Sequence, residues 1–528
     1  MAYLKPDTKL EPVIKGWYTW CHLLAPVPLA MNFAHRYLGI LQSFVANPKV
    51  HVNASSDPAM FGGPFVSLPM EARGAVADLK RTIEGDCAEI LTLARETKAF
   101  DLLLQEQATG YSLEPLYDKV PPSLAGRIEL VYDPLNHPRI RFIEELLAGS
   151  AVSGREHQSI IMTSAREEER DFFLSTPRLR QEGELNISVP FADSRLDLLA
   201  RMRTEDVDLQ QVAVALNLGP EESDLLAGYC SDTPPQRNAP NYSEVGVRIR
   251  YLGHACVLLQ TADVSVLIDP LISSDGSAED GRFSLSDLPD VIDYVVITHG
   301  HQDHLVPETL LQIRYKVNTV VIPRANAGNV VDPSLKLMLQ ELGFQSVRTV
   351  DPFDEVPLPG GRLVSLPFPG EHCDLDIYSR QGLYISLNGV TAMFMVDSRA
   401  VSGQLYSEIS RRVGPVDMAF IGMECDGAPL TWLYGPLLLR PPSRRDDESR
   451  RMSSSNAEQA FAALRYFDCK TCYVYAMGQE PWLRFLMGLE YAPDSVQLLE
   501  CEKLAALCSE AGMSLTRLNL SAEFVLGV

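Results

Sequence analysis

The sequence has few cysteines and no long uninterrupted apolar segment. Ten cysteines occur among 528 residues without the spacing of a disulfide framework, so a disulfide-stapled secreted fold is not expected. Cys469 and Cys472 form a lone CxxC pair, which we interpret as buried thiols rather than a zinc or redox site. Residues 17–33 are apolar but contain a histidine and two prolines, which argues against a membrane span. The N-terminus lacks an apolar signal core, and we expect a cytoplasmic protein with no membrane partner.

Basic residues are also scarce. The sequence has 46 Lys and Arg against 69 Asp and Glu, and its formal net charge at pH 7 is −23. This excess of negative charge disfavours a nucleic-acid partner bound through a generally basic surface. The apolar content of 46% and the charged content of 22% are ordinary for a globular protein. A chain of 528 residues is too long for one ordinary core, so we expect at least two domains.

Residues 1–230 contain no recognisable catalytic motif. Between residues 70 and 107, apolar side chains recur at three- and four-residue spacing, which predicts one long or two shorter amphipathic helices. Short strands are expected at 128–132, 140–143 and 185–189, and a further helix at 196–217. These patterns predict a mixed α/β domain, whose helical faces could also serve a homodimer interface.

A proline-rich segment divides the chain. Residues 231–240 contain three prolines among polar residues, a composition typical of a linker that cannot continue a helix. We therefore predict a separate N-terminal domain, residues 1–240, and a catalytic domain, residues 241–528. In the second domain helices and strands alternate, and helical patterns at 457–466 and 498–511 are expected to close the chain.

The second domain contains a dense cluster of metal-ligating residue types. Within six residues, directly after the β-branched apolar run 295–297, the sequence places His299, His301, Asp303 and His304. A strand that ends in such a cluster delivers imidazoles and a carboxylate to one point at the rim of a sheet. Neutral imidazole and carboxylate are ligands for zinc or for non-haem iron. We interpret the cluster as a two-metal site, with the first two histidines serving one ion and Asp303 and His304 the other.

These residues match the HxHxDH signature of the metallo-β-lactamase fold, and the strands expected before it, at 247–252, 256–261 and 264–269, suit that resemblance. The resemblance implies an αββα sandwich with metals at one edge. It also implies that Asp269 orients a ligating histidine and that Asp397, at the end of an apolar strand, lies between the two metals. For His254, a place at the edge of the site and a structural polar contact both remain open.

Glu371 and His372 are two adjacent candidates for the remaining ligand. In an extended chain neighbouring side chains point to opposite sides, so only one of them would face the ion. A dizinc hydrolase would use His372. Glu371 would instead give three carboxylates and three histidines, an oxygen-rich set that suits iron with open positions. No histidine follows His372 in the sequence, so the last histidine that such hydrolases usually supply is missing, which favours the iron set.

The two-domain length, the stretch Gly-Glu-His-Cys-Asp-Leu-Asp at 370–376 and the missing histidine resemble the diiron amino-acid β-hydroxylase family of chloramphenicol biosynthesis. The resemblance implies that His299, His301 and Glu371 hold one iron, that Asp303 and His304 hold the other, and that Asp397 bridges them. Glu371 and Asp397 would then be central to catalysis.

The same resemblance implies a dioxygen-dependent monooxygenase of antibiotic biosynthesis. Its substrate would be an amino acid held as a thioester on the carrier domain of a nonribosomal peptide synthetase, and hydroxyl would be added at the β-carbon. Two irons, dioxygen and an external electron donor, a reductase or a ferredoxin, would be required. A dizinc hydrolase of the lactonase or phosphodiesterase type, using His372, is the alternative.

An arginine-rich stretch follows the last expected site residue. Its basic residues are Arg440, Arg444, Arg445, Arg450 and Arg451. The prolines, serines and mixed charges of residues 440–456 predict a mobile loop. Because carrier domains are often acidic, the arginines could form a docking surface. A merely solvated loop is the simpler interpretation, since acidic residues at 446–448 lie among the arginines.

Overall fold

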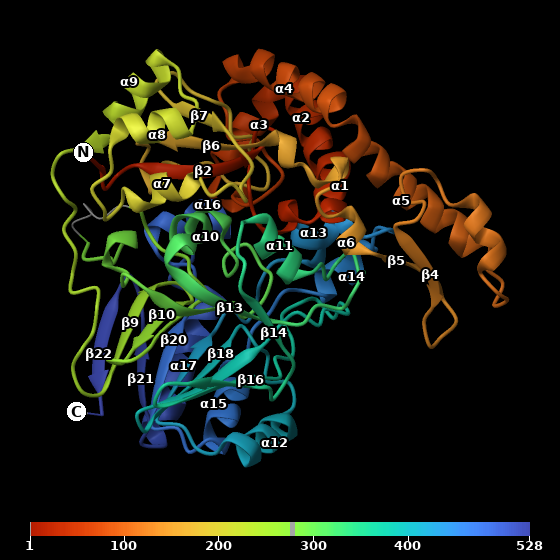
Figure 1. Cartoon of the computed structure of the whole chain (residues 1–528). Coiled ribbons are helices and arrows are strands. Elements are labelled where there is room, and N and C mark those ends of the chain that lie inside the picture. Colours follow the sequence, from red (N-terminus) through yellow and green to blue (C-terminus); the bar gives the residue numbers. More distant parts are fainter. Residues whose placement is uncertain (1, 275–279, 528) are drawn as a thin grey trace.

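The computed structural model describes residues 2–274 and 280–527, and its catalytic half is built around two facing β-sheets (Figure 1). One sheet has the order β14-β13-β12-β11-β10-β9-β22, and the other has the order β15-β16-β17-β18-β19-β20-β21. The first comprises Val347–Val350, Val317–Pro323, Ile292–Val296, Ser265–Ile268, Cys256–Gln260, Val247–Gly253 and Ala522–Leu526. The second comprises Glu355–Leu358, Gly361–Leu366, Gly382–Leu387, Val390–Val396, Met418–Gly422, Thr471–Tyr475 and Ser514–Arg517.

Helices cover both outer faces of this pair of sheets. On the second sheet lie α12 (Gly403–Val413), α15 (Ala457–Tyr466) and α17 (Val496–Glu510), at the bottom of Figure 1. On the first sheet lie α10 (Pro307–Ile313) and α11 (Leu335–Glu341). The expected αββα sandwich is therefore confirmed.

The space between the sheets is filled by apolar side chains from both. Every residue of β9, β10 and β11 is buried, as expected for strands covered on two faces. Phe394 and Phe420 stack with ring centroids 4.7 Å apart, and Phe420 stacks on Tyr473 at 4.9 Å. This aromatic column joins neighbouring parallel strands directly below the strand ends that bear the candidate ligands.

The N-terminal region has its own antiparallel sheet and a helical layer. Its sheet has the order β3-β2-β6-β7, formed by Trp17–Tyr18, Lys9–Ile14, Gln158–Thr163 and Leu185–Ser188. The helices include α1 (Pro26–Asn32), α2 (Leu38–Ala46), α4 (Arg73–Asp86) and α5 (Ala88–Gln107). The hairpin β4–β5 (Ile128–Tyr132 and Pro138–Phe142) projects beside the end of α5 (Figure 1). The prediction of a mixed α/β region is confirmed, and the helical stretch at 70–107 is two helices.

The two regions are packed tightly against each other. One buried apolar cluster contains Trp20 and Leu23 together with Leu305 and Leu310 of the catalytic half. Polar contacts reinforce this packing at Glu308, whose carboxylate accepts a hydrogen bond from Tyr18 Oη (2.8 Å) and pairs with Arg170 (2.5 Å). The N-terminal region is thus part of the support for the catalytic half.

Two expectations about the chain after residue 440 are wrong. Helical patterns do not close the chain, because β21 and β22 follow α17 and add an edge strand to each large sheet. Both strands are mostly half-buried or exposed, so their apolar signal is weak. Residues 440–456 are not simply a loop, since α14 (Arg444–Ser449) begins where Ser443 Oγ accepts a hydrogen bond from Asp446 N (3.2 Å).

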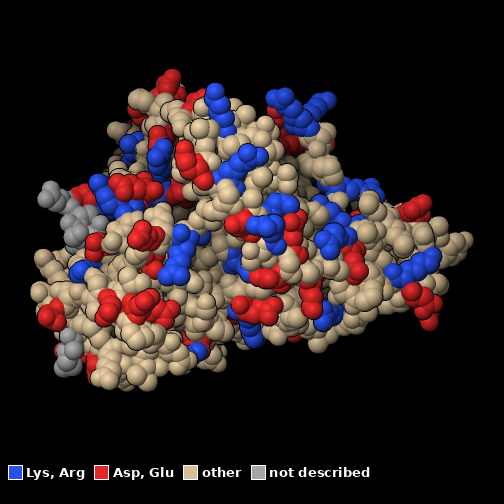
Figure 2. All heavy atoms as spheres, turned by 90° about the horizontal axis from the view of Figure 1, so that it is seen from above, with Lys and Arg blue, Asp and Glu red and all other residues tan. Residues whose placement is uncertain are grey.

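The surface carries mixed charges. On the face drawn in Figure 2, acidic and basic side chains lie interspersed rather than gathered by sign. Within the described ranges, no helix is both long enough and apolar enough to cross a membrane.

Candidate metal centre

The candidate ligands lie in segments that follow four strands, β11, β12, β16 and β18, and they meet at one end of the sandwich. The HxHxDH segment follows β12, whose neighbour β11 runs parallel to it and leads into Asp269. Asp397 directly follows β18, and Glu371 lies in the segment after β16. β11 and β12 are parallel neighbours in one sheet, and β16 and β18 run in the same direction on either side of β17 in the other, so all four strands end at the same end of the sandwich.

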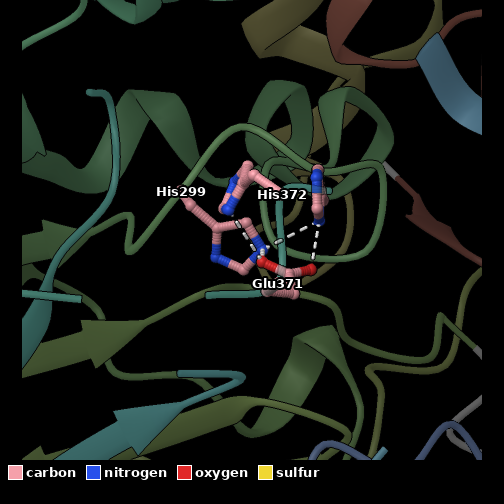
Figure 3. A group of neighbouring side chains, drawn as sticks. His299, Glu371 and His372 are labelled. Atoms are coloured by element: carbon pink, nitrogen blue, oxygen red, sulfur yellow. Dashed lines mark hydrogen bonds and ion pairs between the residues drawn. The ribbon is translucent and has the colours of Figure 1, made fainter. Parts of the chain in front are cut away.

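The first group of donors includes His299, His301 and Glu371. Figure 3 labels His299 and Glu371, whose side chains face each other. His299 Nε2 and His301 Nδ1 lie 3.1 Å apart, and Glu371 Oε1 lies 2.6 Å from His301 Nδ1. The other carboxylate oxygen, Glu371 Oε2, lies 3.5 Å from His299 Nε2. Both imidazoles are buried, with His299 wholly shielded from solvent. Two imidazole nitrogens and a carboxylate thus converge on a single point.

His372 also reaches this group, contrary to the expectation that only one of the two neighbours could. Its Nδ1 lies 3.2 Å from Glu371 Oε2, and each of the four side chains offers an atom within 4.8 Å of the others. The alternation argument is wrong because the chain is not extended here. Gly370 and Glu371 have φ of 86° and 60°, and the turn is held by a hydrogen bond from Arg399 N to Pro369 O (2.7 Å).

The second group of donors is Asp303 and His304, with His254 beside them. His254 Nε2 lies 3.0 Å from Asp303 Oδ2, and His304 Nε2 lies 3.7 Å from the same oxygen. The structure therefore places His254 against a candidate ligand at the edge of the site. This contact with Asp303 is also a structural polar contact, so the structure agrees with both interpretations of His254.

Asp397 lies between the two groups. Its Oδ2 is 2.9 Å from His304 Nε2 and 4.0 Å from His299 Nε2. Gly422, at the end of the adjacent strand β19, makes room for this carboxylate, because a Cβ added there would collide with Asp397 Oδ1. The aspartate is therefore placed where it could contact metals bound to either set of histidines.

A buried hydrogen-bond network orients the imidazoles. Asp269 accepts from Thr298 N (2.7 Å) and from Thr298 Oγ1 (2.6 Å), and its Oδ2 lies 2.8 Å from His304 Nδ1. The predicted contact between Asp269 and a candidate ligand is thus confirmed. Tyr434 Oη lies 2.6 Å from His301 Nε2, so the Nδ1 atom of this histidine is the one that faces Glu371. Such contacts fix which ring nitrogen is free to bind a metal.

Burial and mutual charge perturb the acidity of the cluster. Burial disfavours the charged imidazole of His301, but the neighbouring Glu371 outweighs this effect and raises the pKa of His301. Burial alone would raise the pKa of Glu371, yet the imidazoles of His301 and His372 lower it to about 2. Burial raises the pKa of Asp397, and the charges of Glu371 and Asp303 add to that rise. The cluster therefore contains carboxylates that repel one another in a site largely closed to water.

The donor set fits a pair of metal cations. Three overlapping groups offer closely spaced ligand atoms, and the group His299, His304 and Asp397 shares a residue with each of the others. Asp397 Oδ1 is buried and has no hydrogen-bond partner among the described residues, so its lone pairs are free. Two divalent cations would relieve the carboxylate repulsion and use these lone pairs. Three imidazoles and three carboxylates make an oxygen-rich set of the kind that suits iron.

Next to the cluster lies a cavity of about 290 Å³ whose lining includes residues that sequence reasoning missed. Its inner wall contains His301, Asp303, Glu371 and Asp397, and Glu424 stands beside them. Glu424 follows the fully buried strand β19 much as Asp397 follows β18, a pattern that could have marked it. Tyr434 lies on α13 (Leu430–Tyr434), and no local pattern in the sequence connects it with His301.

The sandwich and the clustered histidines and carboxylates define a dinuclear metalloprotein of the metallo-β-lactamase fold. Residues 248–358 match the model of a beta-lactamase superfamily domain, and residues 3–234 match that of a diiron non-heme beta-hydroxylase N-terminal domain. The chain is 35% identical over 524 residues, 98% of each chain, to the 4-amino-L-phenylalanyl-[CmlP-peptidyl-carrier-protein] 3-hydroxylase of Streptomyces venezuelae.

The chain belongs to the diiron non-heme β-hydroxylase family. The crystal structure of CmlA, a diiron β-hydroxylase from Streptomyces venezuelae, has a TM-score of 0.92 to this chain at 34% identity, with both chains fully covered. A CmlA variant structure gives a TM-score of 0.91 at 33% identity, again with full coverage. The expected enzyme class, a diiron hydroxylase that uses dioxygen, is thereby confirmed, and the hydrolase alternative is set aside.

Proposed function

We propose that this protein hydroxylates the β-carbon of an amino acid held as a thioester on the carrier domain of a nonribosomal peptide synthetase. The relative from Streptomyces venezuelae is named for such a reaction on a carrier-bound aminoacyl group, and it aligns with the chain almost end to end. The observation that carries the proposal is the position of Glu371, whose carboxylate faces His299 and His301 in a buried cluster open to a cavity.

We assign the ligands as follows, as part of this proposal. One iron would be held by His299, His301 and Glu371, the other by Asp303 and His304, and Asp397 would contribute to both. His372 stays outside the ligand set and supports Glu371 from 3.2 Å. When bound, the iron pair supplies the activation of dioxygen for insertion into a C–H bond. Glu371 and Asp397 would hold the irons, and the adjoining cavity would receive the reacting part of the substrate.

The stoichiometry requires an external electron donor. Adding one oxygen atom of dioxygen to a C–H bond and releasing the other as water consumes two electrons and two protons. A reductase or a ferredoxin would supply the electrons, and this partner is part of the proposal.

Part of the arginine-rich segment lines the cavity, which supports carrier docking there. Trp432 of α13 and Arg451, just after α14, both line the cavity. Arg444 is 90% exposed, although it pairs with Glu448 at 2.7 Å. A carrier domain seated on α14 would present its arm to the opening. Charge reversal of Arg444 and Arg445 should weaken turnover of carrier-bound substrate several-fold, and unchanged turnover would contradict this site.

The domain division, the homodimer and the cellular location are further parts of the proposal. The residue ranges matched by the two family models support domains at 1–240 and 241–528. The projecting end of α5 and the hairpin beside it expose apolar side chains, including Leu102, Tyr111 and Leu135, which would suit contact with a second copy. Light scattering on purified protein tests the dimer.

All ten cysteines are free thiols, which supports a reducing compartment such as the cytoplasm.

Intact mass spectrometry tests the proposed reaction directly. Aminoacyl carrier domains would be incubated with iron-loaded protein, a reductant and oxygen, and the expected product is heavier by one oxygen atom, about 16 Da. Glu371→Ala should remove iron and product together, whereas His372→Ala should keep most of the iron. Iron retained by the Glu371 variant and lost by the His372 variant would reverse the ligand assignment.

A further inference from the structure

Glu424 occupies a distinctive place in the cavity beside the metal centre. It follows β19 by two residues and shares the cavity wall with four of the candidate ligands. None of the three groups of closely spaced ligand atoms includes it. Its carboxylate therefore borders the space next to the cluster instead of completing the cluster itself.

Among the described residues, Glu424 also lacks the arginine partner that two other acidic residues of this cavity have. Asp426 pairs with Arg451 at 2.8 Å, and Glu490 pairs with Arg484 at 2.7 Å. For Glu424, the only side-chain polar contact found among the described residues is a long one, 3.4 Å from Tyr491 Oη. An ammonium group entering the cavity would supply the charged donor that this carboxylate lacks among the described residues.

A second acceptor borders the same space. Gln302 lines the cavity and is only 5% exposed, and its Oε1 has no hydrogen-bond partner among the described residues. An ammonium group has three N–H donors, so a carboxylate and an amide oxygen suit it together.

An aminoacyl thioester brings one obligatory cation near the reacting carbon. Its α-ammonium group is attached to the α-carbon, and the β-carbon is bonded to that same α-carbon. Fixing the ammonium therefore fixes where the β-carbon can lie. A carboxylate beside the metal ligands is suited to this positioning task.

We propose that Glu424, assisted by Gln302, binds the α-ammonium group of the aminoacyl substrate and so directs its β-carbon toward the metal centre. This inference rests on the proposed function, because it requires an aminoacyl substrate. It makes Glu424 a determinant of specificity for amino acids over the corresponding acids that lack the amino group.

Two matched probes test the proposal without turnover. Both are hydrolysis-stable pantetheine amides, one carrying L-phenylalanine and the other 3-phenylpropanoic acid, which lacks only the amino group. Their dissociation constants for iron-loaded protein would be measured by calorimetry in the absence of reductant. The wild type should prefer the amino probe by about tenfold or more, consistent with one charge-assisted contact. Glu424→Gln should reduce the preference to about threefold or less.

Glu490→Gln is the matched control, since this residue lines the same cavity but already has a basic partner. It should keep the wild-type preference. A Glu424→Gln variant that keeps the full preference would overturn the inference, and so would one that loses iron, because Glu424 would then be a metal ligand. A wild type that binds the two probes equally would also overturn the inference, whereas the proposed function fails only if the mass-spectrometric test gives no oxygenated product.

Discussion

Asp269→Asn is a sharp test of how the protein orients its metal ligands. Asp269 is fully buried and serves three groups, Thr298 N, Thr298 Oγ1 and His304 Nδ1. With a carboxylate in this place, His304 carries its proton on Nδ1 and directs the lone pair of Nε2 toward the metal site. An asparagine would turn an N–H donor toward His304, which favours the tautomer with its proton on Nε2. That tautomer cannot bind a metal through Nε2.

The expected effect is a loss of iron affinity of about 10- to 100-fold, the usual range for residues that orient a metal ligand. This corresponds to about 1.4–2.7 kcal/mol of binding free energy. The metal-free protein should also lose about 1–3 kcal/mol of stability, because a buried polar network is left partly unsatisfied. Competition with a graded series of iron chelators measures the first effect, and urea unfolding of metal-free protein measures the second.

Asp293→Asn is the matched control. Asp293, on β12, also accepts from a backbone amide and a hydroxyl of one residue, Ser265 N and Ser265 Oγ, both at 2.9 Å, but it touches no histidine among the described residues. This variant should lose stability and keep its iron affinity. Equal iron affinity in wild type and Asp269→Asn, or equal losses of affinity in both variants, would refute the tautomer argument.

Three further outcomes are expected. Tyr434→Phe removes the contact at His301 Nε2 and should weaken iron binding by roughly tenfold, measured by the same chelator competition, while a variant with wild-type affinity would contradict the role of Tyr434. Gly422→Ala places a methyl group against Asp397 and should lower the iron content and shift the visible spectrum of the iron-loaded protein, and an unchanged spectrum would count against Asp397 as the bridge. Burial raises the pKa of Glu144 to about 7, so its contribution to stability is full below about pH 4.5 and is lost as the pH rises through about 7. Unfolding curves should therefore show wild type losing about 1–3 kcal/mol relative to Glu144→Gln between about pH 5 and pH 8, and parallel pH profiles would disprove this linkage.

The site was predictable where its residues are close in sequence and follow an apolar strand. His299 to His304 meet both conditions, whereas Asp397, at the end of β18, meets only the second. Glu371 was singled out by the absence of a later histidine and by the family resemblance of the stretch at 370–376. Its contact with His301 depends on a left-handed backbone that nothing local predicts for a non-glycine residue. Glu424 has the same signal as Asp397, a place shortly after a buried strand, whereas Tyr434 joins the site through tertiary packing alone.

The fold shows the same division. Buried strands such as β19, the sequence Met-Ala-Phe-Ile-Gly, can be recognised by a continuous apolar run. β2, the sequence Lys-Leu-Glu-Pro-Val-Ile, is fully buried although it includes two charged residues and a proline. Glu11 is tolerated there because it pairs with Arg170 (3.0 Å) and Arg178 (2.7 Å), more than 150 positions along the chain. Partners so distant leave no periodic signature in the sequence.

The packing of the N-terminal region against the catalytic half limits how far the chain of this enzyme could be shortened. Cys21 Sγ contacts Gly300 O at 3.0 Å, between the first two histidines of the signature, and His22 lies with His301 around a small internal void. Removing residues 1–240 would remove these contacts from the segment 299–304, which contains the HxHxDH ligands. It would also bare the apolar side chains of α10, among them Leu310. A truncated catalytic fragment would aggregate through its exposed apolar surface and would bind iron poorly. It would therefore be a poor starting point for a minimal biocatalyst.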